Sequence, residues 1–88
     1  MSESSVGPGA AADADARLVD ARGLACPMPV LELSKAVEEV GVGERVRLLA
    51  TDPAAKVDVP VWCRMQRQRL RAQHLDDHVW TFEVERVR

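Results

Sequence analysis

The fold of this 88-residue chain is decided at a junction with the sequence Gly23-Leu24-Ala25-Cys26-Pro27-Met28-Pro29-Val30. A helical pattern begins at Pro27, because proline is favoured at the first helical position, where its fixed φ fits and its missing N–H is not needed. Cys26 is then expected to be the N-cap, at the positive end of the helix dipole. This setting predicts a lowered pKa for the thiol, and the thiolate is the reactive form. Cys26 is therefore the candidate reactive residue.

The neighbours of Cys26 are expected to support it. Pro27 and Pro29 lack an N–H and stiffen the helix entry, which predicts a rigid thiolate held by few bonds. Gly23 can supply an unusual backbone conformation before the cysteine loop. Such a thiolate suits sulfur transfer between proteins, whereas a metal site needs several converging ligands. The alternative is a buried cysteine that packs as a small hydrophobic residue.

Apolar periodicity extends outward from this junction. Val30, Leu33, Val37 and Val40 recur at helical spacing, which predicts an amphipathic helix over 27–40. A short strand is expected before the junction, over 17–20. Alternation after the helix predicts a half-buried strand over 45–51.

The second half of the chain predicts another helix and two more strands. Asp52-Pro53 is a helix-start signal, and Pro60 interrupts the segment that follows. We therefore expect a short turn over 53–57 and a main helix over 59–68, capped by Asp58. Strands over 70–75 and 79–87 are expected to form a hairpin through 76–78.

The resulting order, β-α-β-α-β-β, predicts a two-layer α/β (α+β) sandwich. Its mixed four-stranded sheet would carry both helices on one face, with a parallel pair from the β-α-β unit and an antiparallel hairpin. Apart from Met1, residues 1–16 contain one large apolar residue, the isolated Val6, and are expected to be a disordered tail. One domain is expected over 17–88.

Composition excludes several classes of function. The formal charge of −2 argues against a general polyanion binder, so no direct contact with nucleic acid is expected. No apolar run is long enough for membrane insertion, and the first residues do not resemble a secretory signal. Two cysteines in that context suit the reducing cytoplasm. The core is small, so no internal cofactor is expected. No resident metal is expected either, because a metal site needs several converging ligands.

Three other groups of residues have alternative interpretations. Cys63 stands mid-helix and is predicted to be a structural core residue, with a resolving partner for Cys26 as the alternative. A histidine–aspartate group at the hairpin suits a solvated turn better than a metal site. An arginine-rich segment over 64–71 either neutralises a helix end or docks an acidic partner or RNA, and RNA is the weaker version because interleaved aromatic residues are missing. The last two groups are His74, Asp76, Asp77, His78 and Arg64, Arg67, Arg69, Arg71.

The stretch Val19-Asp20-Ala21-Arg22-Gly23-Leu24-Ala25-Cys26-Pro27-Met28-Pro29 resembles the Cys-Pro-x-Pro signature of TusA-like sulfur carriers, the SirA/YedF group. The segments Thr51-Asp52-Pro53-Ala54 and Asp58-Val59-Pro60-Val61-Trp62-Cys63 are similar to the second helical segment of that family. The resemblance covers about residues 17–87. Many relatives have a glycine-histidine pair where Arg67-Gln68 stand here.

The resemblance implies the same two-layer sandwich. It also implies that Cys26 carries sulfur covalently, as a persulfide. It implies a cysteine desulfurase or rhodanese-type donor, an acceptor sulfurtransferase and, in some relatives, a transporter of sulfur compounds. Downstream products in the family include thiolated tRNA bases, molybdenum cofactor and oxidised sulfur species. Met28 and Arg22, and more remotely Arg64 and Arg67, are the expected partner-binding residues.

Two other classes of function stay open at this point. One is a non-catalytic interaction or regulatory module that docks through the arginine-rich segment over 64–71. The other is a thiol-redox sensor, which needs Cys26 and Cys63 to pair. The sequence Cys-Pro-Met-Pro is not a C-x-x-C dithiol motif.

Overall fold

Four strands and two helices make up the part of the chain that the computed structural model describes, residues 16–88. The predicted tail over 1–16 lies outside these residues apart from Ala16. The elements are β1 (Arg17–Ala21), α2 (Met28–Glu39), β2 (Arg45–Ala50), α3 (Ala55–Gln66), β3 (Arg69–Asp76) and β4 (Val79–Glu85).

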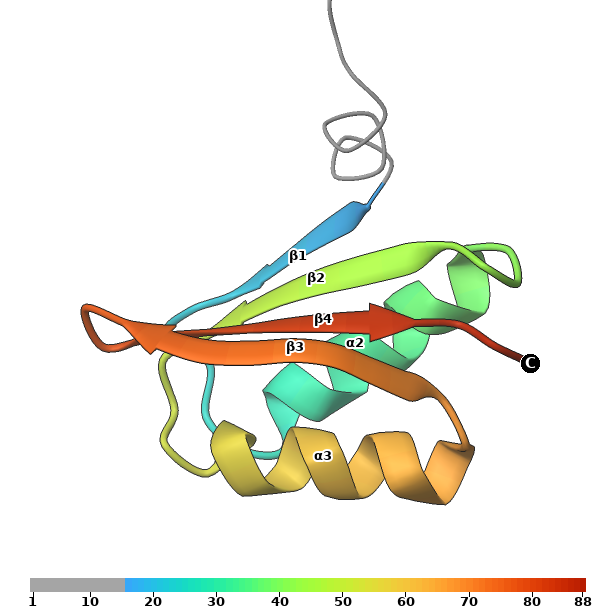
Figure 1. Ribbon diagram of the computed structural model, residues 1–88. Helices are drawn as coiled ribbons and strands as arrows, with labels where there is room; N and C mark the ends of the chain where they lie inside the picture. The colour runs from blue at the N-terminus through green and yellow to red at the C-terminus, as the bar shows by residue number, and fades with distance from the viewer. Residues whose placement is uncertain (1–15) are drawn as a thin grey trace, which may run out of the picture.

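The sheet has the order β1-β2-β4-β3, with β1 parallel to β2 and with β4 antiparallel to both β2 and β3. Both helices cover the same face of this sheet (Figure 1). The predicted two-layer sandwich with a mixed sheet is therefore confirmed.

The core lies between the two central strands and the helices. Alternate residues of β2 and β4 point toward the helices and are buried, as the period of two in a strand requires. The helices bury positions three or four residues apart, which form one stripe on each helix. The main buried side chains are Val46, Leu48, Phe82 and Val84 from the sheet and Leu33, Ala36, Val37, Val59 and Cys63 from the helices.

The opposite face of the sheet is open and carries ion pairs. Arg47 on β2 donates to Glu83 on β4 at 2.6 Å, and Arg71 on β3 donates to Glu85 at 2.9 Å. The half-buried strand predicted over 45–51 is confirmed by β2, which buries every second residue. Neither α2 nor α3, the helices of residues 16–88, is long and apolar enough to cross a membrane.

The prediction that Pro60 interrupts the second helix is wrong. Helix α3 runs unbroken from Ala55 to Gln66 with Pro60 inside it. Proline removes one backbone hydrogen bond, here to the carbonyl of Lys56, whose residue is exposed. Buried residues on both sides of the proline, Val59 and Cys63, hold the segment against the sheet, so tertiary packing overrides the local preference.

Helix α3 is followed by its C-cap residue, Arg67, which adopts a left-handed conformation with φ of 58°. Its N–H donates to the carbonyl of Arg64, and the N–H of Gln68 donates to the carbonyl of Cys63. This left-handed helix cap is one that glycine forms without a steric penalty. The sequence places an arginine at this position, and strain follows from its Cβ.

Replacing Arg67 with glycine is expected to raise the free energy of unfolding by about 1 kcal/mol, because it removes the Cβ from a left-handed residue. Chemical denaturation measures the change. Arg67→Ala is the matched control, since it removes the arginine side chain but keeps the Cβ, and it should give no comparable gain. An equal gain in both variants would contradict the backbone explanation.

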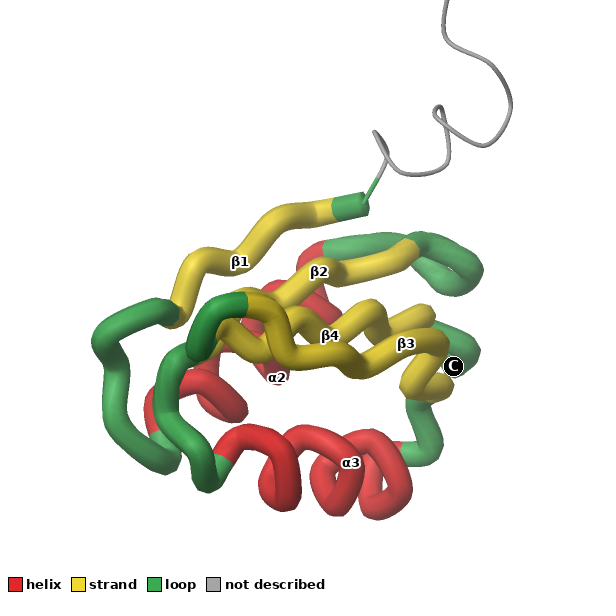
Figure 2. The backbone as a smooth tube through the Cα atoms, turned by 60° about the vertical axis from the view of Figure 1, so that its left-hand side comes forward, coloured by secondary structure: helices red, strands yellow, loops and turns green. Residues whose placement is uncertain are grey.

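Two loops meet at one edge of the sheet. Because β1 and β2 are parallel neighbours, their carboxyl ends lie at the same edge, and the loops to α2 and to α3 leave from there. Figures 1 and 2 show these two loops side by side. The cysteine loop therefore meets the segment that precedes α3, although the two are far apart in the sequence.

Candidate functional site

Cys26 is exposed in the loop between β1 and α2. Helix α2 begins at Met28 with Pro27 as its N-cap residue, so the prediction that Cys26 is the N-cap is wrong. The Cys26–Pro27 peptide is cis. The N–H of Met28, at the start of α2, donates to the carbonyl of Ala25 at 2.8 Å. The end of α2 therefore does not hold the sulfur.

Two carboxylates hold Cys26 in place of the helix end. The Sγ–H of Cys26 donates to Asp58 Oδ2 at 2.9 Å, and its backbone N–H donates to Asp52 Oδ2 at 2.6 Å. Asp52 precedes α3, where its Oδ1 also accepts the N–H of Ala54 at 3.0 Å. Asp58 lies in the first turn of α3. The site thus combines the loop after β1 with the loop and helix after β2.

The pKa of Cys26 is raised above its ordinary value, which corrects the predicted lowering. The main cause is the hydrogen bond to Asp58, followed by desolvation of the sulfur and repulsion from the Asp58 and Asp52 carboxylates. A bond donated by the thiol stabilises the neutral form, and a neighbouring negative charge destabilises the thiolate. The pKa of Asp52 is lowered, because the backbone N–H groups of Ala54 and Cys26 donate hydrogen bonds to its carboxylate.

The loop around Cys26 is held by further contacts. Gly23 has a φ of +83°, the unusual conformation that was predicted, and its N–H donates to Thr51 Oγ1 at 2.9 Å. Arg22 pairs with Asp20 at 2.8 Å, which lowers the pKa of Asp20 to about 2. Pro29 is buried against the core. These contacts join the start of the loop to β1 and to the residue after β2.

Exposed apolar side chains flank the cysteine. Leu24 precedes it, Met28 follows it at 40% exposure, and Leu31 lies one turn further along α2. An accessible sulfur beside accessible apolar side chains suits contact with another protein. Met28 therefore stays a proposed partner-binding residue.

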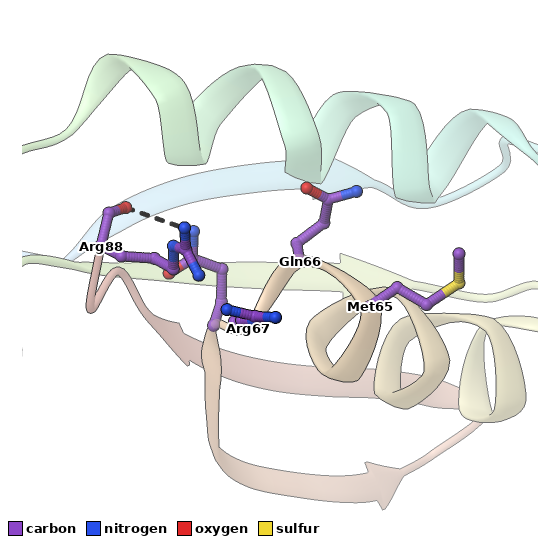
Figure 3. Close-up of a pocket in the computed structure, with 5 residues that line it drawn as sticks. Met65, Gln66, Arg67 and Arg88 are labelled. Atoms are coloured by element: carbon purple, nitrogen blue, oxygen red, sulfur yellow. Dashed lines mark hydrogen bonds between the residues drawn. The ribbon is translucent and has the colours of Figure 1, made fainter.

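Arg64 and Arg67 lie at the other end of α3. Arg67, the C-cap residue, lies nine positions after Asp58 along α3, a rise of about 13.5 Å. Arg67 lines an open hollow of about 460 Å³ with Met65, Gln66, Gln68 and Arg88 (Figure 3). The structure does not bring this hollow together with Cys26.

Cys63 is a core residue in the described structure. Its side chain is 3% exposed, and burial raises the pKa of its thiol to about 11. A thiol with this pKa is ionised to about one part in ten thousand at pH 7. The structural interpretation of Cys63 is therefore favoured over the resolving-partner alternative.

We expect the exposed Cys26 of the native protein to react with an excess of a chromogenic disulfide at pH 7 before the buried Cys63 does, and both thiols to react in denaturant. Cys63 should be at least about a hundredfold slower in the native state, because it combines burial with scarce thiolate. Peptide mass mapping assigns each modification, and Cys63→Ala is the control. Equal native reactivity of both cysteines would contradict the burial of Cys63.

The two histidines lie on the hairpin formed by β3 and β4. His74 lies on β3, and His78 lies in the hairpin turn with a φ of 67°. Within residues 16–88, no group of three or more histidine, cysteine or acidic side chains is placed to hold a metal ion.

Sequence reasoning missed Asp52 and Asp58 as site residues, because it treated both as helix-start signals. A usable signal was present for Asp52. The predicted parallel pairing of the first two strands requires the loops that follow them to meet at one edge. The sequence contained no such signal for Asp58, because the contact of Asp58 with Cys26 depends on α3 being unbroken.

Together, the fold and site define a class of small α+β proteins that present one accessible cysteine at a strand–helix junction. The chain belongs to the sulfurtransferase TusA family, whose model matches residues 17–86. The resemblance based on the Cys-Pro-Met-Pro stretch is thereby confirmed.

Curated relatives and a solved structure agree with this assignment. A candidate sulfur carrier protein of Archaeoglobus fulgidus is 45% identical over 71 residues, covering 80% of this chain and 92% of the relative. The candidate sulfur carrier protein YrkI of Bacillus subtilis is 33% identical over 70 residues, covering 80% and 93%. The crystal structure of a SirA-like protein from Desulfitobacterium hafniense has a TM-score of 0.71 at 22% identity, covering 81% and 97%. This last likeness shows the shared fold.

Proposed function

We propose that this protein is a sulfur-relay protein that carries sulfur as a persulfide on Cys26. The observation that carries the proposal is the exposed Cys26 at a loop of a family whose curated relatives are candidate sulfur carriers. The proposed donor is a cysteine desulfurase or a rhodanese-type protein, and the proposed acceptor is a sulfurtransferase with a reactive cysteine. The proposed location is the cytoplasm.

The transfer conserves atoms and electrons. Cys26 Sγ attacks the outer sulfur of the donor persulfide, a new S–S bond forms, and the donor S–S bond breaks to leave the donor thiol. The proton lost by Cys26 is balanced by the proton gained by the donor. The acceptor thiolate then attacks the outer sulfur on Cys26, so that the acceptor S–S bond forms and the S–S bond to Cys26 breaks. Cys26 regains a proton in exchange for the one that the acceptor thiol lost, and the original thiol is restored.

The surroundings of Cys26 support exchange with another protein. Pro27 and the buried Pro29 limit movement of the chain at the start of α2. Gly23 fixes the loop start, while the exposed Met28 and the nearby Arg22 offer apolar and charged contacts. We assign these residues to support and docking.

The other two classes of function receive less support. A redox sensor needs Cys63 to form a disulfide with Cys26, and Cys63 is buried with a raised pKa. A regulatory module would use the arginine-rich segment over 64–71, which begins at the far end of α3. Arg64 and Arg67 therefore stay a predicted docking surface separate from the cysteine.

Incubation with a cysteine desulfurase and cysteine, or with a rhodanese and thiosulfate, tests the proposal. We expect a mass gain of one sulfur atom that is removed by a thiol reductant. Peptide mapping under non-reducing conditions should place the sulfur on Cys26. A protein that gains no sulfur from either donor system, or gains it elsewhere, would contradict the proposal.

A further inference from the structure

The contact between Cys26 and Asp58 suggests a role that the family assignment leaves open. Asp58 Oδ2 accepts the thiol hydrogen bond at 2.9 Å, across 32 residues of sequence. We propose that Asp58 is a positioning residue that holds the unloaded Cys26 as a neutral thiol turned toward α3. The effect on the thiol follows from this contact, whereas its consequence for sulfur loading rests on the proposed function.

Two hydrogen bonds fix the position of the cysteine, one at its backbone N–H and one at its thiol. Asp52 accepts the backbone N–H of Cys26, so the main chain of the cysteine is tied to the segment before α3. Asp58 accepts the thiol from the first turn of α3 itself. The backbone contact brings Sγ within reach of α3, and the second contact selects its direction.

The charged groups that act on Cys26 are acidic. Asp58 and Asp52 both disfavour the thiolate. Arg22, in the same loop, is paired with Asp20. Lys56 lies in the first turn of α3 and lines a hollow with Thr51, Pro53, Leu75, His78 and Trp80. The charged groups that shift the pKa of the thiol are the two carboxylates. The first turn of α2 carries no acidic side chain, so the acidic influence comes from the α3 side.

An unloaded carrier held in this way has a low thiolate fraction at neutral pH. Electrophiles and disulfides react with the thiolate, so the idle cysteine is protected although it is exposed. Sulfur loading requires the thiol proton to leave, and this breaks the bond to Asp58. We infer that breaking this bond is part of the loading step.

The pH profile of Cys26 alkylation tests the proposal without any sulfur donor. In Asp58→Asn, the midpoint of the profile is expected to fall relative to the native protein. Each pKa unit of fall raises the thiolate fraction at pH 7 about tenfold. The rate should then rise about threefold per unit, because a thiolate of lower pKa is less nucleophilic.

Matched variants separate a specific effect from a general one. Asp52→Asn should lower the midpoint less than Asp58→Asn, because Asp52 contacts the backbone N–H and not the sulfur. Glu39→Gln, at the end of α2 that is far from the cysteine loop, should leave the midpoint unchanged. Asp58→Glu, which keeps a carboxylate, should stay closer to the native midpoint than Asp58→Asn. Peptide mass mapping reports Cys26 separately from Cys63, and circular dichroism verifies the fold of each variant.

An Asp58→Asn midpoint equal to or above that of the native protein would overturn the proposal. If that variant does not fold, the midpoint of Asp58→Ala is measured and judged by the same criterion. The midpoint of the native protein provides a second criterion. A native midpoint at or below that of a cysteine in an unfolded peptide of the same loop also overturns the proposal. Failure of sulfur loading would instead contradict the proposed function and leave this result intact.

Discussion

Cys26→Ser is expected to gain no sulfur from either donor system, whereas the native protein gains one atom. Serine keeps the size and a hydroxyl that can donate to Asp58, but oxygen cannot form the persulfide. The loop contacts through Asp52 and Thr51 involve backbone N–H groups of Cys26 and Gly23, so they survive the substitution. The measurement is intact mass before and after incubation with donor.

Cys63→Ala is the control for this experiment. It removes a thiol that is buried on α3, and the folded fraction should load sulfur to the native level. Because the change leaves a small cavity, its folding is verified first by circular dichroism. Full loading of Cys26→Ser, or loss of loading in a folded Cys63→Ala, would contradict the assignment of the sulfur to Cys26.

Phe82→Ala is expected to lower the free energy of unfolding by about 3–5 kcal/mol. Phe82 is 0% exposed at the centre of β4, and its ring stacks on Trp80 with 6.1 Å between centroids. Truncation removes the buried ring and leaves a cavity that the surrounding strands and helices fill only in part. A chain of this length has a total stability of about 4–13 kcal/mol, so the variant should lose much of it.

Urea denaturation followed by circular dichroism measures this loss. Thr81→Ala is the matched control, because Thr81 directly precedes Phe82 on β4 and points to the open face of the sheet. Its change should stay within about 1 kcal/mol. A loss below about 1 kcal/mol in Phe82→Ala, or equal losses in both variants, would contradict the position of the core.

Much of the fold could be predicted from apolar periodicity. Leu33 and Val37 belong to the predicted helical stripe and are buried in α2, and Val46 and Leu48 belong to the predicted strand face and are buried in β2. Periodicity works here because each element buries one face, so residues of that face must recur with the repeat of the element. The boundaries shifted by one to a few residues, as at the end of β4.

The prediction for the second helix failed because it used local preference alone. Pro60 disfavours a helix, and the sequence around it offers a plausible restart at Asp58. In the structure, Val59 and Cys63 bury the same face of α3 on either side of the proline. Burial of these side chains depends on the sheet, which a local pattern does not contain.

The predicted chemistry of Cys26 failed for a related reason. A helix end is a local feature, and it suggested a lowered pKa. The thiol instead donates to Asp58, and its pKa is raised. The direction of the shift thus follows from a residue that folding brings to the sulfur.

The sequence by itself determined the order of strands and helices, the buried faces and the family, because these depend on periodicity and on a motif of consecutive residues. It also identified Cys26 as the candidate reactive residue, with Pro27 and Pro29 as the residues that stiffen the chain beside it. The tertiary structure decided which charges surround the sulfur. Parallel pairing of β1 and β2 and the unbroken α3 bring Asp52 and Asp58 to Cys26, and electrostatic interactions act through distance in space, not through separation in sequence.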